Sequence, residues 1–176
     1  TWGNFGDTFG RKRIYMSGFL LFAIGLLVLT FSTSVTHLII GRIIQAVGQS
    51  MTVTNGFAIA VAMFPDRQRG LVIGLVGASV GVGLSLGPIF GAVILDQFEW
   101  RALFWTRIPL SLLAMVAATI IIPKDPKTSF GKKTFDYRGA ILLFISLTSF
   151  LIYINRLPVE PLTSRMMYVL LTTFVI

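Results

Sequence analysis

An uninterrupted apolar stretch at residues 70–95 constrains this chain more than any other feature of its sequence. No charged residue occurs between Arg69 and Asp96, and the stretch is long enough to cross a hydrocarbon core of about 30 Å at about 1.5 Å per residue. Glycine destabilises a helix in water by roughly 0.5–1 kcal/mol relative to alanine. In lipid, however, small residues at four-residue spacing let two helix backbones approach closely. The stretch therefore predicts a membrane-spanning helix that packs tightly along one side.

The glycines of this stretch recur at helical spacing, at Gly74, Gly77, Gly81, Gly83, Gly87 and Gly91. Pro88 lies among them, and a proline inside a helix removes one backbone hydrogen bond and bends the helix axis. A static packing helix is the simpler interpretation of this pattern. We favour a moving helix, because the pattern combines close contact with a point of weakness.

The overall composition places the chain in the membrane class. Only 12% of its residues are charged, whereas a soluble domain has about a quarter. The net charge of +8 resides in short loops between apolar runs, which indicates membrane topology and not a nucleic-acid partner. The sequence contains no cysteine and no phosphate-binding Gly-x-x-x-x-Gly-Lys motif. We therefore expect no enzyme activity, no cofactor and no metal site.

Apolar runs predict an all-α polytopic membrane protein with about five full spans and one truncated span. The expected spans are residues 14–31, 37–64, 70–95, 102–122 and 139–155, followed by the run at 166–176. That last run has eleven residues, whereas a span needs about 20. Residue 1 is Thr1 and no signal-peptide pattern follows it. We therefore interpret the chain as an internal piece, with the remainder of the same polypeptide as its partner.

The cations divide unequally between the two sides of the membrane when successive loops are assigned alternately. One side receives Arg11, Lys12, Arg13, Arg67, Arg69, Lys124, Lys127, Lys132, Lys133 and Arg138. The other side receives only Arg101, Arg156 and Arg165. The positive-inside rule then places the opening loop in the cytoplasm. We expect an integral multi-pass protein of the plasma membrane.

The second predicted span carries the most informative polar residues. Arg42, Gln45, Gln49 and Thr52 are spaced by three, four and three residues, so they share one helical face. An arginine inside the membrane costs roughly 2.5–3.5 kcal/mol on insertion scales, so Arg42 should face a cavity or a partner. The alternative is that Arg42 snorkels to the outer interface while the glutamines bond to neighbouring helices.

The opening stretch combines glycines with a carboxylate and three consecutive cations, and we expect a loop there. Gly3, Asp7, Gly10, Arg11 and Lys12 match the pattern Gly-x-x-x-Asp-x-x-Gly-Arg-Arg/Lys. This pattern resembles the loop between the second and third spans of the major facilitator superfamily. The resemblance implies a helical-bundle transporter in which this loop acts in the switch between inward- and outward-facing states.

Two further motifs resemble this superfamily. Residues 38–48 are similar to its fourth-span pattern Leu-x-x-x-Arg-x-x-Gln-Gly, with Ala46 replacing the last Gly. The resemblance implies that Arg42 acts in proton movement and substrate handling, with Gln45 and Gln49 beside it. The set Gly74, Gly83, Gly87, Pro88 and Gly91 resembles the fifth-span signature of antiporters.

Two later motifs indicate which branch of the superfamily the chain resembles. The sequence Trp-Arg-Ala-Leu-Phe at residues 100–104 looks like the entry to the sixth span of drug exporters. The sequence Phe-Asp-Tyr-Arg-Gly-Ala at residues 135–140 resembles the start of the extra central spans of the fourteen-span drug:proton antiporters. Residues 1–122 would then belong to an N-terminal six-helix bundle, 123–138 to a cytoplasmic loop, and 139–176 to the extra central spans.

The resemblance implies export of amphipathic or cationic organic compounds in exchange for protons, by alternating access. The partners would be a small-molecule substrate, protons and the lipid bilayer. Alternatives are a metabolite or siderophore exporter of the same fold, and a transport-inactive sensor or scaffold. Every Asp and Glu lies in a loop or at a span edge. A proton-coupling carboxylate is therefore expected outside these residues.

Overall fold

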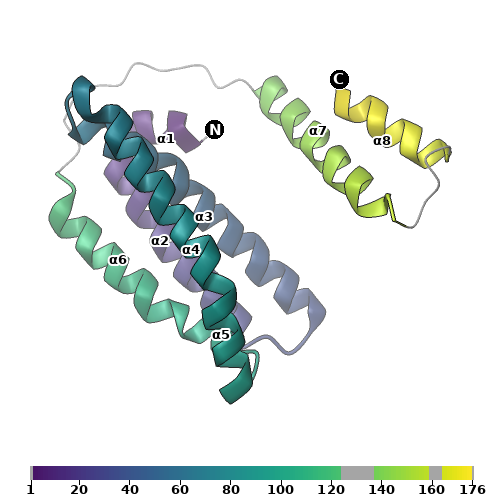
Figure 1. The fold of residues 1–176 in the computed structure, drawn as a ribbon, viewed down its shortest axis with the longest axis horizontal. Coiled ribbons are helices and arrows are strands. Elements are labelled where there is room, and N and C mark those ends of the chain that lie inside the picture. Colours follow the sequence, from purple (N-terminus) through teal and green to yellow (C-terminus); the bar gives the residue numbers. More distant parts are fainter. Residues whose placement is uncertain (1, 124–136, 159–163, 176) are drawn as a thin grey trace. The chain divides into compact units, whose positions relative to one another are not determined.

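The computed structural model describes residues 2–123, 137–158 and 164–175, and within these it is built from helices (Figure 1). Two compact units are present, one containing helices α1–α6 and the other helices α7 and α8. The predicted loop at 123–138 lies mostly outside the described residues, as do its four lysines.

The helix boundaries follow the predicted spans closely. The first unit contains α1 (Trp2–Phe9), α2 (Arg11–Thr30), α3 (Val35–Met63), the 3-10 turn η1 (Asp66–Gln68), α4 (Arg69–Gln97), α5 (Ala102–Trp105) and α6 (Arg107–Ile121). The second unit contains α7 (Tyr137–Arg156) and α8 (Arg165–Val175).

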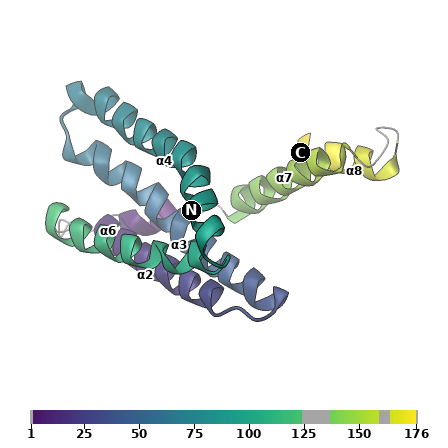
Figure 2. The same ribbon diagram turned by 60° about the horizontal axis from the view of Figure 1, so that its bottom comes forward.

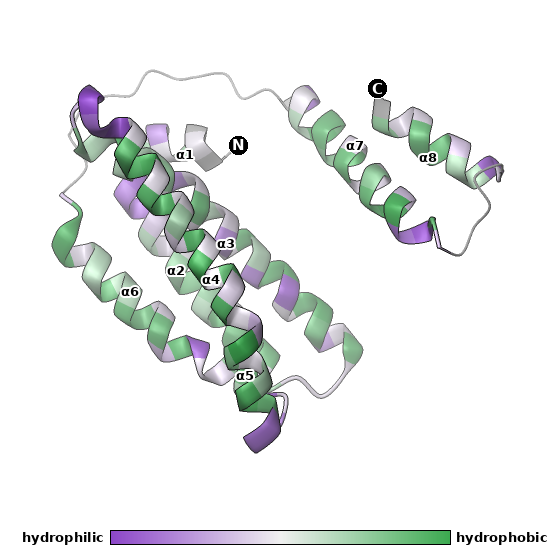
Figure 3. Cartoon of the chain, viewed as in Figure 1, coloured by the Kyte–Doolittle hydropathy of each residue, from purple (hydrophilic) through white to green (hydrophobic). Residues whose placement is uncertain are grey.

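Four segments of the described chain are long and apolar enough to cross a membrane: Arg11–Thr30, Asp66–Gln97, Ala102–Ile121 and Arg138–Arg156. Helix α3 has 29 residues but is not among the four, and its sequence is interrupted by charged and amide side chains. The apolar residues cover the helix bodies, while the hydrophilic ones gather at helix ends and along α3 (Figure 3). The all-α membrane fold predicted from the sequence is thereby confirmed.

Helices α2 and α3 form the closest pair of the first unit. A Cβ built on Gly18 would lie 2.9 Å from the carbonyl oxygen of Gly48, and one on Gly25 would lie 2.6 Å from the backbone nitrogen of Gln45. A Cβ on Gly48 would overlap the backbone of α2. Gly18 and Gly25 of α2 are seven residues apart, as are Gly41 and Gly48 of α3, which is about two helical turns, so each pair lies on one face. Glycine thus brings these two backbones into contact, as small residues do between membrane helices.

The glycines of α4 have almost no neighbours in the described part of the chain. No atom of the described chain lies within 4 Å of a Cβ built on Gly74, Gly77, Gly81, Gly83 or Gly87. A Cβ on Gly91 would meet only the side chain of Leu103, at 3.9 Å. Within the described part of the chain, tight glycine packing is found between α2 and α3, and the packing predicted for α4 stays a prediction about the remaining polypeptide. Helix α4 runs unbroken through Pro88 and leaves α3 at the η1 turn (Figure 2).

The opening stretch is a helix and not the predicted loop. Residues Trp2–Phe9 form α1, and the chain turns at Gly10 before α2 begins. Gly10 has φ 101°, a backbone conformation that side chains with a Cβ rarely adopt. The glycines predicted to make several turns are accommodated within α1, and only Gly10 needs its conformational freedom.

The predicted span at 102–122 is also interrupted. Helix α5 ends at Trp105, Thr106 lies between, and α6 begins at Arg107. Pro109 has no N–H group and so cannot bond to the carbonyl four residues before it. The hydroxyl and the backbone N–H of Thr106 both donate to the carbonyl oxygen of Ala102, at 2.6 and 3.2 Å. Helix α6 then runs alongside α2 (Figure 2).

The second unit is a pair of helices. The rings of Phe150 in α7 and Phe174 in α8 stack with their centroids 4.6 Å apart. The hydroxyl of Ser146 donates to the carbonyl oxygen of Phe174 at 2.7 Å, and Met167 is buried.

Candidate functional site

The polar row of α3 is divided between a buried and an open part. Gln45 is 6% exposed and packs against Gly25 of α2, whereas Arg42 and Gln49 are exposed. Arg42 Nη1 donates to Gln45 Oε1 at 3.2 Å. The structure therefore brings Arg42 and Gln45 together. The side chain of Gln49 makes no hydrogen bond to the side chain of either residue, although the three residues share one side of the helix.

Arg42 also meets an aromatic ring from another helix. Its guanidinium carbon lies 5.3 Å from the centroid of the Phe104 ring in α5. Phe104 is 7% exposed and belongs to a cluster with the fully buried Leu26 and Leu29 of α2. The ring is therefore held by the core while one part of it faces the cation.

The free energy that these two contacts contribute is comparable to the free-energy cost of inserting the Arg42 charge into a membrane. A hydrogen bond to a charged group contributes about 1.5–3 kcal/mol. A cation over an aromatic ring adds roughly 0.5–2 kcal/mol, depending on desolvation. Insertion of arginine costs roughly 2.5–3.5 kcal/mol. Arg42 is the eighth residue of α3, about 10 Å along the helix axis from its start, and its neighbours can hold it there.

The charged residues of the opening motif form a second cluster, at the end of the unit opposite to α5 (Figure 1). Arg11 Nε and Nη2 both lie 2.9 Å from Asp7 Oδ1. Arg11 Nη1 also donates to the carbonyl oxygen of Ala58 in α3, at 3.3 Å. The guanidinium therefore links α1 and α2 to the far half of α3, and Asp7 is only 17% exposed in its side chain.

The remaining motif residues pack against α3 and α6. A Cβ built on Gly3 would meet the methyl group of Thr54 at 3.7 Å. Lys12 Nζ donates to the carbonyl oxygen of Thr119 at 2.8 Å and to that of Ile122, at the end of α6. Such terminal carbonyls have no partner within their own helix. The structure thus brings Asp7, Arg11 and Lys12 to one end of the unit, away from Arg42.

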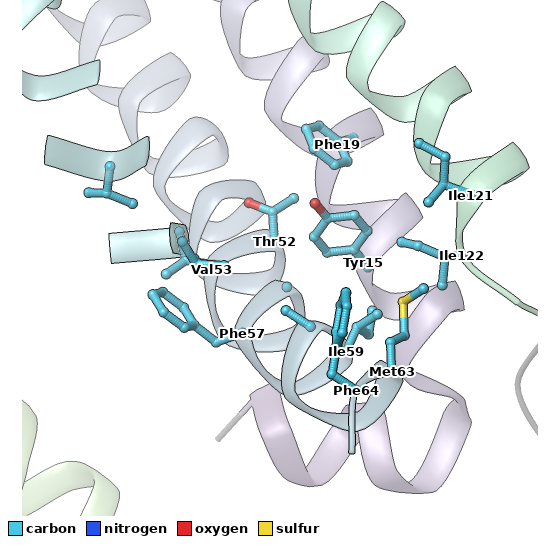
Figure 4. A pocket seen from close by; sticks show the side chains of 14 residues that line it. Tyr15, Phe19, Thr52, Val53, Phe57, Ile59, Met63, Phe64, Ile121 and Ile122 are labelled. Carbon is cyan, nitrogen blue, oxygen red and sulfur yellow. The ribbon is translucent and has the colours of Figure 1, made fainter. Parts of the chain in front are cut away.

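An apolar pocket of about 520 Å³ opens between α2, α3, α4 and α6. Figure 4 shows Tyr15 and Phe19 on one wall, Val53 and Phe57 on another, and Ile121 and Ile122 on a third. Thr52, the last residue of the polar row, also lines this pocket. No charged side chain lines it, so any charge on a bound molecule would have to be met elsewhere.

The comparison with known families decides what kind of bundle this is. A family model described as Major Facilitator Superfamily matches residues 1–176. The chain belongs to this superfamily. Membership confirms the resemblance to the superfamily that the sequence motifs indicated.

Several curated members of the superfamily are similar to this chain. A riboflavin transporter of Clostridioides difficile is 37% identical over 150 residues, which are 85% of this chain and 32% of that protein. Multidrug resistance protein 3 of Bacillus subtilis is 32% identical over 146 residues, which are 83% of this chain and 28% of that protein. A triacylglyceride transporter of Mycolicibacterium smegmatis is 35% identical over 146 residues, or 82% and 26%. The chain thus spans about a third of the length of the relatives it matches, or less.

Sequence reasoning missed the contacts of three residues. Phe104 has no periodic pattern that marks it as a partner of Arg42. Lys12 was assigned to the switch motif, and its bond to α6 connects residues 107 positions apart. Asn55 is fully buried beside Gly6 and continues the spacing of the polar row by three residues beyond Thr52, which is a signal that the sequence offers.

Proposed function

We propose that this chain forms part of a secondary transporter that exports amphipathic or cationic organic compounds in exchange for protons, by alternating access. The observation that carries the proposal is Arg42, a permanent charge two turns into the otherwise largely apolar helix α3, in contact with Gln45 and Phe104. The similarity of the chain to proteins named for multidrug resistance supports a drug as the class of substrate. The plasma membrane is the proposed location.

The role proposed for Arg42 follows from its chemistry. A guanidinium does not release its proton in proteins, so Arg42 cannot itself carry the exchanged proton. It can stabilise the ionised form of a nearby carboxylate and thereby change when that carboxylate binds a proton. We place the carboxylate in the remainder of the transporter, because the acids of the described residues are Asp7, Asp66, Asp96 and Glu99, which lie in α1 or near span ends.

The test measures proton-driven uptake of a cationic dye into everted membrane vesicles that contain the complete transporter. Arg42→Ala should abolish uptake at a normal protein level, and Arg42→Lys should restore little of it, because an ammonium lacks the planar donors of a guanidinium. Arg107→Ala, which removes an exposed cation from the start of α6, is the matched control and should retain uptake. Normal uptake by Arg42→Ala would return Arg42 to the snorkelling interpretation.

Metabolite export is the second candidate, and the 37% identity to a riboflavin transporter favours it. The same vesicles distinguish the two candidates when riboflavin replaces the cationic dye. Riboflavin uptake without dye uptake would select the metabolite exporter. Uptake of neither compound, nor of a panel of amphipathic cations and metabolites, would select the transport-inactive sensor or scaffold.

Asp7 is proposed to act in the switch between the two access states and not in substrate contact. Its carboxylate is engaged by Arg11, which in turn holds the backbone of α3, so the pair joins three helices at one end. Asp7→Asn weakens this link without changing shape, and should slow turnover with little change in substrate affinity. A large loss of equilibrium affinity at normal turnover would place Asp7 in a binding site.

The cation distribution gives the proposed orientation, with the η1 turn in the cytoplasm and the α2–α3 turn outside. Single cysteines at Gln68 and Val35, both exposed, test it in a chain that has no cysteine of its own. An impermeant thiol reagent should label Val35→Cys on intact cells and Gln68→Cys only after lysis. The reverse labelling would overturn the orientation.

A further inference from the structure

The contact between Arg42 and Phe104 joins two segments that are 62 positions apart in the sequence. The guanidinium carbon lies 5.3 Å from the ring centroid, within the range of about 6 Å in which a ring attracts a cation. Arg42 is exposed, whereas Phe104 is 7% exposed and packed on Leu26 and Leu29. Core packing therefore holds the ring, whereas the cation is held by side-chain contacts alone.

Phe104 is itself connected to the loop before α5. Trp100 meets it edge-to-face, with ring centroids 5.9 Å apart and planes at 85°. Arg101 lies over the Trp100 ring at 4.6 Å and donates from Nη2 to the carbonyl oxygen of Ser32 at 3.1 Å. The ring that faces Arg42 therefore packs both against the leucines of α2 and against Trp100 of this loop.

A ring contact has a particular consequence for an arginine. Hydrogen bonds occupy the N–H groups of a guanidinium, which has five donors, whereas an aromatic ring attracts the cation through the negative face of its π system. One N–H group of Arg42 donates a hydrogen bond to the side-chain oxygen of Gln45. The ring can hold the cation in place and leave its other donors available to an incoming acceptor such as a carboxylate.

We propose that Phe104 is a positioning residue for Arg42, whose ring fixes the guanidinium in the orientation in which Arg42 works. This inference rests on the proposed function, in which Arg42 acts in proton-coupled transport. Phe104 touches neither substrate nor proton in this scheme, and it acts only through Arg42. The competing interpretation is that Phe104 is a core residue whose contact with Arg42 is incidental.

The first measurement separates the two interpretations by changing the ring's charge distribution at nearly constant shape. Phenylalanines with one, two and three ring fluorines replace Phe104 in the complete transporter. Each fluorine weakens the attraction of the ring face for a cation, so dye uptake should fall stepwise, by about three- to tenfold over the series, at constant melting temperature. Phe22, which packs against the same buried leucines, is the matched control, and its fluorination should leave uptake unchanged. Unchanged uptake along the Phe104 series overturns the proposal.

The second measurement is a double-mutant cycle on melting temperature, with Arg42→Met, Phe104→Leu and the double variant. Coupled residues give a double variant less destabilised than the sum of the single changes, whereas an incidental neighbour gives additive shifts. Additive shifts overturn the contact itself. Phe104→Trp should keep most of the uptake that Phe104→Leu loses, because it keeps an aromatic face.

The outcomes distinguish this inference from the proposed function. If Arg42→Ala is inactive and the fluorine series at Phe104 is flat, only the positioning role of Phe104 is wrong. If Arg42→Ala transports normally, the proposed function of Arg42 is wrong, and the positioning role fails with it even where the melting temperatures are coupled. Inactivity of Arg42→Ala together with stepwise loss at Phe104 supports both.

Discussion

Lys12 Nζ, in the first turn of α2, lies 2.8 Å from the carbonyl oxygen of Thr119, in the last turn of α6. The same ammonium bonds to the carbonyl oxygen of Ile122, just after the helix ends. A cation at this end of a helix both satisfies free carbonyls and interacts favourably with the helix dipole. A residue of the opening motif therefore links α2 and α6, which are far apart in the sequence, at one end of the bundle.

Loss of this ammonium should destabilise the first unit. Lys12→Met keeps the aliphatic stem but leaves the α6 carbonyls without their donor, at an expected cost of about 1–2 kcal/mol. The melting temperature of the purified complete transporter measures the effect. Arg67→Gln, which removes an exposed cation from η1 at the neighbouring turn, is the control and should change little. Equal shifts in the two variants would show that the bond to α6 contributes nothing.

The glycine interface of α2 and α3 gives a second stability prediction. A Cβ at Gly48 would overlap the backbone of Phe22 and lie 2.7 Å from the carbonyl oxygen of Gly18. Backbone atoms cannot move aside as a side-chain end can, so Gly48→Ala should cost about 1–3 kcal/mol or more. Gly70→Ala, in the first turn of α4, should be neutral or slightly stabilising in the same melting experiment, because no atom of the described chain lies within 4 Å of a Cβ built there. A neutral Gly48→Ala would contradict the close approach of the two backbones.

The sequence predicted the helices well because charges bound the apolar runs. Residues 37–64 were expected as a span, and α3 is Val35–Met63; residues 139–155 were expected, and α7 is Tyr137–Arg156. The helix α1 was missed because glycine signals turns locally, while the contacts that Gly6 and Arg11 make with α3 favour a docked helix. The break between α5 and α6 was missed because the prediction did not consider that Pro109 lacks an N–H group.

The site was predictable only within single helices. The spacing of Arg42 and Gln45 placed them on one face, and they are hydrogen-bonded. The partners from other helices were not predictable, because helical periodicity gives the face of each residue but not the helix that it meets. For the same reason the glycine pattern of α4 was read as the tight interface, whereas the interface of the described unit uses Gly18, Gly25 and Gly48.

Gly6 and Asn55 form a size-matched pair, which gives a third prediction. A Cβ on Gly6 would overlap Asn55 Oδ1, and Asn55 is fully buried with its Nδ2 donating to the carbonyl oxygen of Met51 at 2.9 Å. Gly6→Ala should displace α1 from α3 and expose the Arg11–Arg13 segment to trypsin.

A second change should rescue the first. Asn55→Ala removes the overlapping atom, an acceptor that has no hydrogen-bond partner in the described part of the chain. The double variant should therefore resist trypsin nearly as well as the parent, although Asn55→Ala leaves a small cavity of its own. A double variant cleaved as fast as Gly6→Ala would show that the damage at Gly6 has another cause.

The glycines of α4 give the last prediction, which separates folding from transport. Gly87 has no neighbour within 4 Å of a built Cβ, so Gly87→Val leaves the packing of the described unit undisturbed. If α4 works by close contact with helices of the remaining polypeptide, the valine must push one of them away, which typically costs about 1–3 kcal/mol. That cost falls unequally on the two access states when the helix bends at Pro88.

Gly87→Val should therefore trap one access state, and a cysteine at Gln49 on α3 should report it as altered reactivity with a thiol reagent. Pro88→Ala removes the constraint that proline places on the helix, and should lower flux without lowering the melting temperature. Val82→Leu, an exposed apolar change in the same helix, is the control and should be nearly silent. Normal transport by Gly87→Val, or equal damage by Val82→Leu, would make α4 an ordinary lipid-facing helix and remove the main support for a moving one.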